Sequence, residues 1–471
     1  EYIPPVFHDP GRFLNSYRET EIRRSGLVFL RRITPLSRRD AVYFCSGVYN
    51  FGTTNSSVAV ASSRNHVRLA SFSSAETMQE VFRSALFFYE HHDGGLRRTE
   101  TYTGNEAIDH YLSGAEGRFI QSLKSYLPVR SFTATSILGR TYHFEDLLAI
   151  LLRGLHHSAA RSLGKLGNRA VIGRPVRFAD AITQDDEKFA LARLEAAARR
   201  SGIEEVIFEY EPVAAAYHYE KSLDHDELIL VGDFGGGTSD FSLITVGPGA
   251  STRGTHRIVG NAGVGVAGDS FDAAIVRRVV SPMLGKDGPY ASMGKKLGMP
   301  AWIYTKLERW HHLSFLKTRE NLRTIRSIRA AALDPAPLDG LLAIIEEDLG
   351  FHLHRSVQQI KRELSAHKTA KFVFDAPGIS LSTVVTRNQF ENWIREEVEA
   401  ITSCLDRLLT SAGISPSLVD RVFLTGGSSF VPAIRKMFEL RFGREKIAGG
   451  SEFTSVASGL ALRSLEYAAG H

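Results

Sequence analysis

The sequence predicts an α/β fold in which helices cover the sheets. The chain has 471 residues, of which 43% are hydrophobic and 23% charged, so it can bury several cores. Apolar, β-branched runs alternate with segments in which apolar residues recur at helical spacing. Two glycine-rich hairpins of similar plan stand far apart in the chain. Together these observations favour sheets covered by helices. They also indicate that the two similar hairpins have the same function.

Composition excludes several classes of protein. No run approaches the roughly 20 consecutive apolar residues of a membrane span, so we expect no membrane location. Two cysteines, Cys45 and Cys404, cannot build a disulfide framework, which favours a reducing, cytoplasmic compartment. The net charge is +5, and no Lys/Arg block of the kind that binds nucleic acid is present.

The first segment, residues 1–41, shows no clear periodicity. It is rich in arginine but also contains Glu1, Asp9 and Glu19, whereas a transit peptide would be poor in acidic residues. We therefore expect an accessory or mis-assigned N-terminal extension rather than a targeting signal.

Each hairpin joins two apolar strands through a polar residue, a Phe and a Gly-Thr turn. The first turn is Asn50–Thr54 and the second is Asp233–Thr238. Glycine at such a turn supplies positive φ and lets backbone N–H groups approach an anion without a Cβ in the way. Threonine hydroxyls with an Asp or Asn beside a phosphate suit Mg²⁺, which keeps its waters and takes few protein oxygens. Two such turns, facing each other, would clamp a polyphosphate; no P-loop, GxxxxGK[ST], occurs.

Four motifs in order resemble those of the actin-like ATPase superfamily and, within it, the seventy-kilodalton heat-shock chaperones of the DnaK type. They are NFGTTNS from Asn50 to Ser56, EPVAAA from Glu211 to Ala216, DFGGGTSD from Asp233 to Asp240, and GGSSFVP from Gly426 to Pro432. Each motif alone is weak, but the set in this order is specific.

The resemblance implies a two-lobed actin-like ATPase fold, built from duplicated ribonuclease H-like domains, with a nucleotide cleft between the lobes. We expect lobe I at 42–225, lobe II at 226–425, and a C-terminal segment at 426–471 that returns to lobe I. The stretches VIGRPVRF, EEVIFEYEPVAAA and SLKSYL further resemble the short, YegD-like members. The chain stops soon after Gly427, so we expect neither the family's hydrophobic linker nor its peptide-binding β-sandwich.

The resemblance also implies roles at the phosphate end. Asp233 would hold Mg²⁺ through water, although an Asp here can also simply cap a turn. Glu211 would orient the attacking water, or merely favour a helix dipole. Lys124 aligns with a lysine near the γ-phosphate, but an isolated lysine is usually a solvated surface charge. The expected catalytic residues are Lys124, Glu211, Asp233 and Thr238.

For the nucleotide, ATP or ADP, the resemblance implies contacts from the two turns, from a helix in IKRELS and from the last glycine pair. Many relatives carry an arginine that stacks on adenine at the position of Phe430. Phe430 could still stack on the base, but the contribution of a positive charge to the stacking would be absent. The expected nucleotide-binding residues are Asn50, Gly52, Thr53, Thr54, Gly235, Gly236, Gly237, Lys361, Arg362, Ser365, Gly426, Gly427, Ser428 and Phe430.

Asn50 departs from the family, which has an aspartate before the first turn. An amide can accept a hydrogen bond from a metal-bound water, but it supplies no negative charge and takes no proton. We therefore expect nucleotide binding with slow or lost hydrolysis.

One helix is predicted without any family. Thr386 and Gln389 form a capping box, and an apolar stripe follows to Leu409 before Gly413 ends the helix. Pro432 suits the first turn of a later helix.

Three functions remain open. The first is a monomeric, nucleotide-switched chaperone-like ATPase, whose clients and co-chaperones the sequence does not reveal. The second is a kinase of sugar-type small molecules on the same fold, for which the sequence shows no separate acceptor site. The third is a nucleotide-bound scaffold without turnover, which Asn50 favours.

Overall fold

The computed structural model describes residues 47–63, 66–73, 78–93, 96–113, 115, 117–178, 180–220, 223–251, 257–309, 313, 316–448 and 455–469. The predicted extension at 1–41 and Cys45 lie outside the described residues.

The strands are β1 Gly47–Asn50, β2 Asn55–Ser63, β3 His66–Leu69, β4 Phe72–Ser73, β5 Met78–Gln79, β6 Phe82–Arg83, β7 Ala85–Asp93, β8 Leu96–Thr103, β9 Gly117–Gln121, β10 Ala134–Ile137, β11 Arg140–His143, β12 Arg169–Arg174, β13 Glu205–Tyr210, β14 Glu227–Phe234, β15 Ser239–Val246, β16 Arg257–Val264, β17 Pro289–Ser292, β18 Lys295–Gly298, β19 Thr369–Ala376, β20 Ile379–Thr386, β21 Arg421–Thr425 and β22 Ile447–Ala448.

The helices are α1 Asn105–Leu112, η2 Leu123–Tyr126, α2 Phe144–Leu163, α3 Gln184–Ser201, α4 Glu211–Glu220, α5 Pro248–Ser251, α6 Gly268–Ile275, η3 Val276–Val280, α7 Ser281–Met283, α8 Ala301–Leu307, α9 Arg319–Ala331, α10 Ala336–Glu346, α11 Gly350–Ala366, α12 Arg387–Trp393, α13 Arg395–Ala412, η5 Pro416–Leu418, η6 Gly427–Phe430, α14 Pro432–Phe442, η7 Arg444–Lys446 and α15 Ser455–Ala469.

Two mixed sheets with the same plan organise the chain. The first has the order β13-β12-β1-β2-β3, and β6 also pairs with β2; the second has the order β22-β21-β14-β15-β16. In both, a central strand pairs antiparallel with the strand that follows it through a hairpin and parallel with a strand from much later in the chain. The two predicted hairpins are therefore equivalent elements of two similar sheets.

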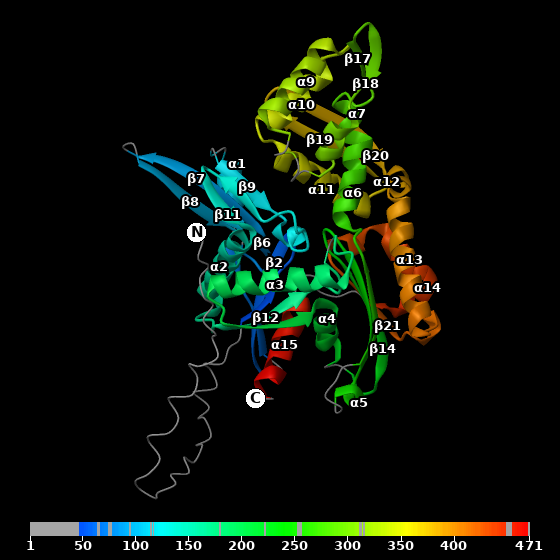
Figure 1. The fold of residues 1–471 in the computed structure, drawn as a ribbon. Helices are drawn as coiled ribbons and strands as arrows, with labels where there is room; N and C mark the ends of the chain where they lie inside the picture. Colours follow the sequence, from blue (N-terminus) through cyan, green and yellow to red (C-terminus); the bar gives the residue numbers. More distant parts are fainter. Residues whose placement is uncertain are drawn as a thin grey trace, which may run out of the picture. The chain divides into compact units, whose positions relative to one another are not determined.

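The first sheet buries both of its faces. Tyr49 and Val58 point into a core with helices α2 and α3, whereas their neighbours Val48 and Ala59 pack on α15. This alternation follows from the period of two residues in a strand. Figure 1 shows α3 running across this half of the molecule, with α15 and α4 side by side below it.

Helix α4 is shared by both sheets. Its residue Ala214 packs in the core with α15 and the first sheet, while Val213 and Tyr217 pack against strands β14 and β15 of the second. Small residues make this possible, since the helix reads Glu-Pro-Val-Ala-Ala-Ala over its first two turns. As α4 begins at Glu211, the packing of this helix fixes the position of a predicted site residue.

The C-terminal segment divides its packing between the sheets, which differs from the expected return of everything after Gly426 to the first lobe. Strand β22 pairs with β21 of the second sheet, and Ile434 and Phe438 of α14 are fully buried in that sheet's core. Among the described residues after Gly426, those of α15, such as Leu460, pack on the first sheet. Helix α14 follows β21 in the chain. Its apolar face is therefore buried against the second sheet, to which β21 belongs.

The helix predicted from Thr386 is two helices. The capping box of Thr386 and Gln389 is present, and Gly413 ends the stretch with φ 66°. However, Ile394 leaves the helical conformation, with φ −98° and ψ 12°, and separates α12 from α13. Helix α12 packs on α6 and β20 and α13 on β16, and one straight helix cannot follow both surfaces. Pro432 stands at the first position of α14, as predicted.

Within the ranges given above, no helix combines the length and the apolar content that crossing a membrane requires.

The contact between α15 and α4 provides a test of this packing. A Cβ added at Gly459 would lie 1.6 Å from the carbonyl oxygen of Ala214, so we expect Gly459→Ala to lower the free energy of unfolding by about 1–3 kcal/mol. Denaturant unfolding measures the change. Gly298→Ala is the matched control, because no atom lies within 4 Å of its added Cβ. Equal stability of the two variants would contradict the packing.

Candidate nucleotide site

One cavity of about 800 Å³ collects the predicted site residues from segments spread over the chain. Its lining includes both hairpin turns, the start of α4, one side of α11 and the loop after β21. The residues predicted for the site that line it are Asn50, Gly52, Thr53, Thr54, Lys124, Glu211, Asp233, Gly235, Gly236, Gly237, Thr238, Lys361, Arg362, Ser365, Gly426, Gly427, Ser428 and Phe430. The structure therefore brings all of them together, while their individual roles stay predictions.

The glycines of the two hairpin turns do not adopt positive φ, and only at Gly52 does the surrounding backbone leave no space for a side chain. Neither Gly52 nor the run Gly235–Gly237 is among the described residues with positive φ, so that expectation is wrong. A Cβ at Gly52 would instead lie 2.0 Å from the carbonyl oxygen of Asn55. At Gly236 it would lie 3.1 Å from the carboxylate of Asp269. A side chain is therefore excluded at Gly52, whereas at Gly236 it would require only a small shift of the Asp269 carboxylate.

Each turn is held by local hydrogen bonds. In the first, the hydroxyl of Ser84 donates to the carbonyl of Gly52 at 2.8 Å, and the N–H of Gly52 donates to Ser56 at 3.3 Å. In the second, the N–H of Gly235 donates to the carbonyl of Thr238 at 3.0 Å, and the N–H of Asp269 donates to Gly236 at 2.7 Å. Bonds of this kind preorganise the backbone before any ligand binds.

Lys124 and Glu211 form a buried ion pair at the cavity. The Nζ of Lys124 lies 2.8 Å from Oε1 of Glu211, and each side chain is only 9% exposed. Lys124 is therefore not the solvated surface charge that remained an alternative from the sequence. It stands on η2, whereas Glu211 opens α4 directly after β13.

Asp233 lines the same end of the cavity, and its cross-strand partner Asp240 is buried beside it on β15 without lining the cavity. Burial and the nearby charge of Glu211 raise the pKa of Asp233 to about 6, although Thr425 donates a hydrogen bond to it at 2.7 Å. Burial, followed by the charges of Asp233 and Glu211, raises the pKa of Asp240 well above its usual value, against a hydrogen bond from Thr238. Burial is the larger cause in both cases, so the ionised forms of these two carboxyl groups are disfavoured mainly because they are removed from water.

A hydrated divalent cation fits this arrangement better than a directly bound one. Across the described ranges, no three His, Cys, Asp or Glu side chains converge closely enough to hold a metal ion between them. Mg²⁺ keeps several waters and needs few carboxylates, so a lone Asp233 with unneutralised charge matches its requirements. A cation there would lower the raised pKa of Asp233 by opposing the charge of Glu211.

The far end of the cavity is built from α11 and the loop after β21. Lys361 is already engaged, with its Nζ 2.7 Å from the carboxylate of Asp272 and donating to the carbonyl of Gly268 at 3.2 Å. Gly426 has φ 82°, and a Cβ there would lie 2.1 Å from the carbonyl oxygen of Phe234. The ring of Phe430 is 51% exposed at the cavity edge, where a planar base could stack.

Sequence reasoning missed two carboxylates on α6. Asp269 and Asp272 both line the cavity, and burial with the charge of Asp272 raises the pKa of Asp269 to about 6. Their spacing of three residues in the first turns of a helix, directly after Gly268, was the available signal. Nearby His354 is buried, which lowers its pKa to about 4 and keeps it neutral.

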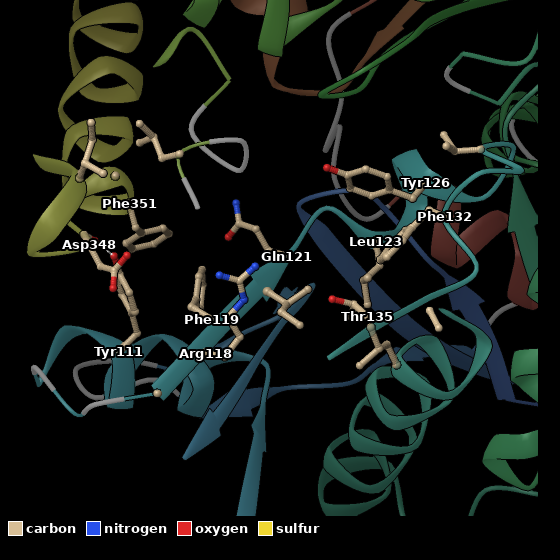
Figure 2. Close-up of a pocket in the computed structure, with 18 of the residues that line it drawn as sticks. Tyr111, Arg118, Phe119, Gln121, Leu123, Tyr126, Phe132, Thr135, Asp348 and Phe351 are labelled. Atoms are coloured by element: carbon tan, nitrogen blue, oxygen red, sulfur yellow. Dashed lines mark hydrogen bonds between the residues drawn. The ribbon is translucent and has the colours of Figure 1, made fainter. Parts of the chain in front are cut away.

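A separate cavity of about 530 Å³ contains none of the predicted residues. Figure 2 shows it between β9 and η2 on one side and α10 and α11 on the other, with aromatic rings at its edge. The hydroxyl of Tyr111 donates to the carbonyl of Asp348, and Phe119 and Phe351 make an edge contact at 5.4 Å between ring centroids. Here two segments from different halves of the chain touch.

The geometry defines an α/β protein with two similar mixed sheets and a cavity formed by the turns of both. The family model described as Hsp70 protein matches residues 127–290 and 346–465, together more than half of the chain. The chain therefore belongs to the Hsp70 family, and its two sheets are consistent with the actin-like ATPase lobes of that family. The matched ranges contain the second hairpin and Glu211, whereas the first hairpin and Lys124 precede them.

The raised pKa of Asp233 predicts a pH-dependent effect of removing its charge. The fold disfavours the ionised form, so stability falls as pH rises from about 4 through about 6, and Asp233→Asn abolishes that loss. We expect the ligand-free variant to gain about 2–3 kcal/mol at pH 8 and much less at pH 4. Urea unfolding at both pH values measures this.

Asp375→Asn is the matched control, because exposed Asp375 also accepts a hydroxyl hydrogen bond, from Ser380 at 2.5 Å. The free energy of unfolding of the Asp375→Asn variant should differ little from that of the unsubstituted chain at either pH. A gain at Asp233 that is the same at pH 4 and pH 8 would contradict the explanation.

Proposed function

We propose that the chain is a chaperone-like ATPase of the short, YegD-like branch, which binds Mg-ATP and closes its lobes around it. Family membership implies nucleotide binding. The observation that carries the proposal is the single cavity lined by both hairpin turns, the Lys124–Glu211 pair and the glycines at 426 and 427. The lobes would be 42–225 and 226–425, joined through α4.

At the phosphate end, the backbone N–H groups and the hydroxyls of Thr53, Thr54 and Thr238 would bind the phosphate oxygens. Asp233 would hold the hydration shell of Mg²⁺, which would supply positive charge to the phosphates when bound. Lys124 would neutralise the γ-phosphate, and Glu211, hydrogen-bonded to Lys124, would orient the attacking water. Burial strengthens each of these charge interactions.

At the nucleoside end, polar groups of α11 and the glycine loop would bind the ribose and base. Arg362 and Ser365 lie on the same cavity wall, and the glycines let the backbone approach the nucleoside. Half-exposed Phe430 would stack on the base without a cation's contribution.

Asn50 argues for slow turnover. Its side chain lines the cavity at the end of β1, the position equivalent to that of Asp233 in the second sheet. The site therefore has a carboxylate from only one of its two matching strands, and the neutral amide cannot accept a proton from water.

The direct test is a calorimetric titration with Mg-ATP and Mg-ADP, followed by a single-turnover assay on the same sample. We expect both nucleotides to bind. We expect Asn50→Asp to raise the rate of hydrolysis by about 10²–10³-fold, which is the rate effect of a single preorganised group in an active site. The absence of binding would refute the proposal.

Asn55→Asp is the control for Asn50→Asp. Asn55 lines the same cavity but accepts a hydrogen bond from Arg83 at 2.7 Å, so the added charge would be neutralised locally. Equal rates for Asn50→Asp and the unsubstituted chain would mean that Asn50 does not limit hydrolysis.

A second candidate function, a small-molecule kinase, is favoured by one observation. A second cavity, of about 550 Å³, shares Ser125, Gly237, Asp269 and Asp272 with the nucleotide cavity. Asp269, with its pKa of about 6, could accept a proton from an acceptor hydroxyl next to the phosphates.

A panel of sugars with Mg-ATP separates the two functions. A kinase would form ADP only with the right acceptor and would lose that activity in Asp269→Asn. A chaperone-like ATPase would release the same ADP with and without sugars.

A further inference from the structure

The guanidinium of Arg193 is buried behind the loop that carries Lys124. Arg193 lies on α3 and is 5% exposed, and it does not line the nucleotide cavity. Nothing in the proposed chemistry uses it directly. A buried arginine is costly unless its donors are satisfied, so its contacts indicate what it supports.

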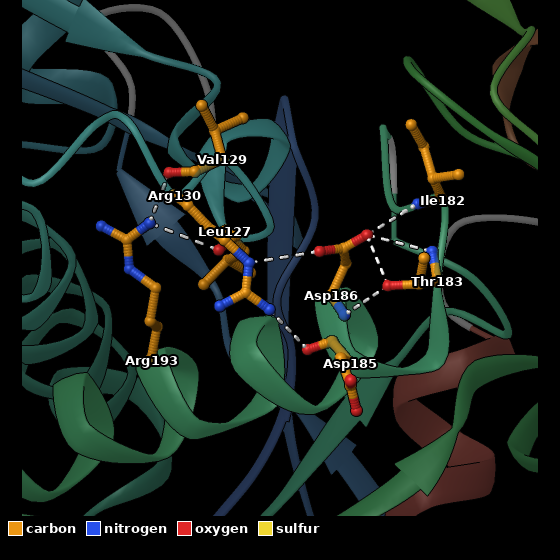
Figure 3. Close-up of polar contacts among 8 residues, drawn as sticks. All are labelled: Leu127, Val129, Arg130, Ile182, Thr183, Asp185, Asp186 and Arg193. Atoms are coloured by element: carbon orange, nitrogen blue, oxygen red, sulfur yellow. Dashed lines mark hydrogen bonds and ion pairs between the residues drawn. The ribbon is translucent and has the colours of Figure 1, made fainter.

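Arg193 donates to four backbone carbonyls of one short loop. Its Nη1 donates to Tyr126 at 3.2 Å, to Leu127 at 3.3 Å and to Val129 at 3.1 Å. Its Nη2 donates to Phe132 at 2.7 Å. Figure 3 shows the side chain rising from α3 to the carbonyls of Leu127 and Val129.

The remaining contacts of Arg193 fix its own position. Its Nε lies 2.7 Å from the carboxylate of Glu145 on α2, and its guanidinium lies 3.9 Å from the ring centroid of Phe144. The planar guanidinium is thereby anchored to helices α2 and α3, which pack in the first sheet's core, and from there it contacts the loop. A lysine could not repeat this, because one ammonium group cannot reach carbonyls spread over seven residues.

The anchored loop is continuous with the turn that bears Lys124. Turn η2 is Leu123–Tyr126, so Arg193 binds the carbonyl of its last residue and of the residue after it. Ser122, the residue directly before the turn, has φ 60°, a left-handed conformation that needs support from its surroundings. From this turn the side chain of Lys124 reaches Glu211 at 2.8 Å.

We propose that Arg193 is a positioning residue, which holds η2 so that Lys124 meets both Glu211 and the γ-phosphate. This rests on the proposed function. The requirement is geometric, since a displacement of about 1 Å in a reacting constellation can cost about 100-fold in rate. Arg193 acts through Lys124 and touches no nucleotide.

A double-mutant cycle with Lys124 tests this. Arg193→Met, Lys124→Met and the double variant are compared by calorimetry with Mg-ATP and Mg-ADP and by single-turnover hydrolysis, all in an Asn50→Asp background so that turnover is measurable. We expect Arg193→Met to lower the rate about 10- to 100-fold, with ADP affinity changed less than about twofold. In the Lys124→Met background it should change the rate by less than about twofold, because the side chain that it positions is gone.

The matched control is Arg200→Met. Arg200 lies two turns further along α3 and also pairs with α2, through Asp146 at 2.7 Å, but no described contact joins it to the loop. It should leave the rate and both affinities unchanged. Should Arg193→Met fail to fold, Arg193→Lys keeps the charge over Phe144 and replaces it in the cycle.

The outcomes separate the inference from the function. A rate loss for Arg193→Met that is the same with and without Lys124 would mean a general structural role and would overturn the inference alone. No loss at all would do the same. If the unsubstituted chain binds no Mg-ATP, the proposed function fails, and the inference fails with it.

Discussion

The buried ion pair of Lys124 and Glu211 is the interaction on which the site depends. It joins a turn from one segment of the chain to the first residue of α4, and it provides the positive charge at a cavity end rich in carboxyl groups. Two charges can remain this deeply buried only with good geometry and additional partners. Burial, together with the charge of Glu211, raises the pKa values of Asp233 and Asp240, and the charge of Lys124 opposes the shift at Asp233 without cancelling it.

Helix α4 places that ion pair between the two sheets. Its alanines and Val213 allow α15 with the first sheet to pack on one side and the second sheet on the other. A change in how the sheets approach each other would therefore alter the packing of the helix that begins with Glu211. This shared element would give the proposed lobe closure a physical basis, because the ion pair in the cavity and the packing of both sheets involve the same helix.

Much of the site could be predicted from the sequence, since short motifs carry their own local geometry. The two hairpins, the capping box at Thr386 and the end at Gly413 all depend on neighbouring residues and are present. Of the two reasons given for the turn glycines, positive φ was wrong. The close approach of Asn55 to Gly52, which excludes a side chain there, depends on the folded backbone. Asp269 was missed because no motif used in the prediction included it.

The sequence by itself determined the α/β class, the pair of hairpins and the set of residues that meet at one cavity, because these depend on local patterns and on motifs kept in order. Tertiary structure alone decided that Lys124 is buried, that α12 and α13 are separate, that α14 packs on the second sheet, and that Arg193 supports η2. Burial, ion pairing and pKa shifts depend on groups that are distant in the chain, so they are set only when the packed sheets bring those groups together.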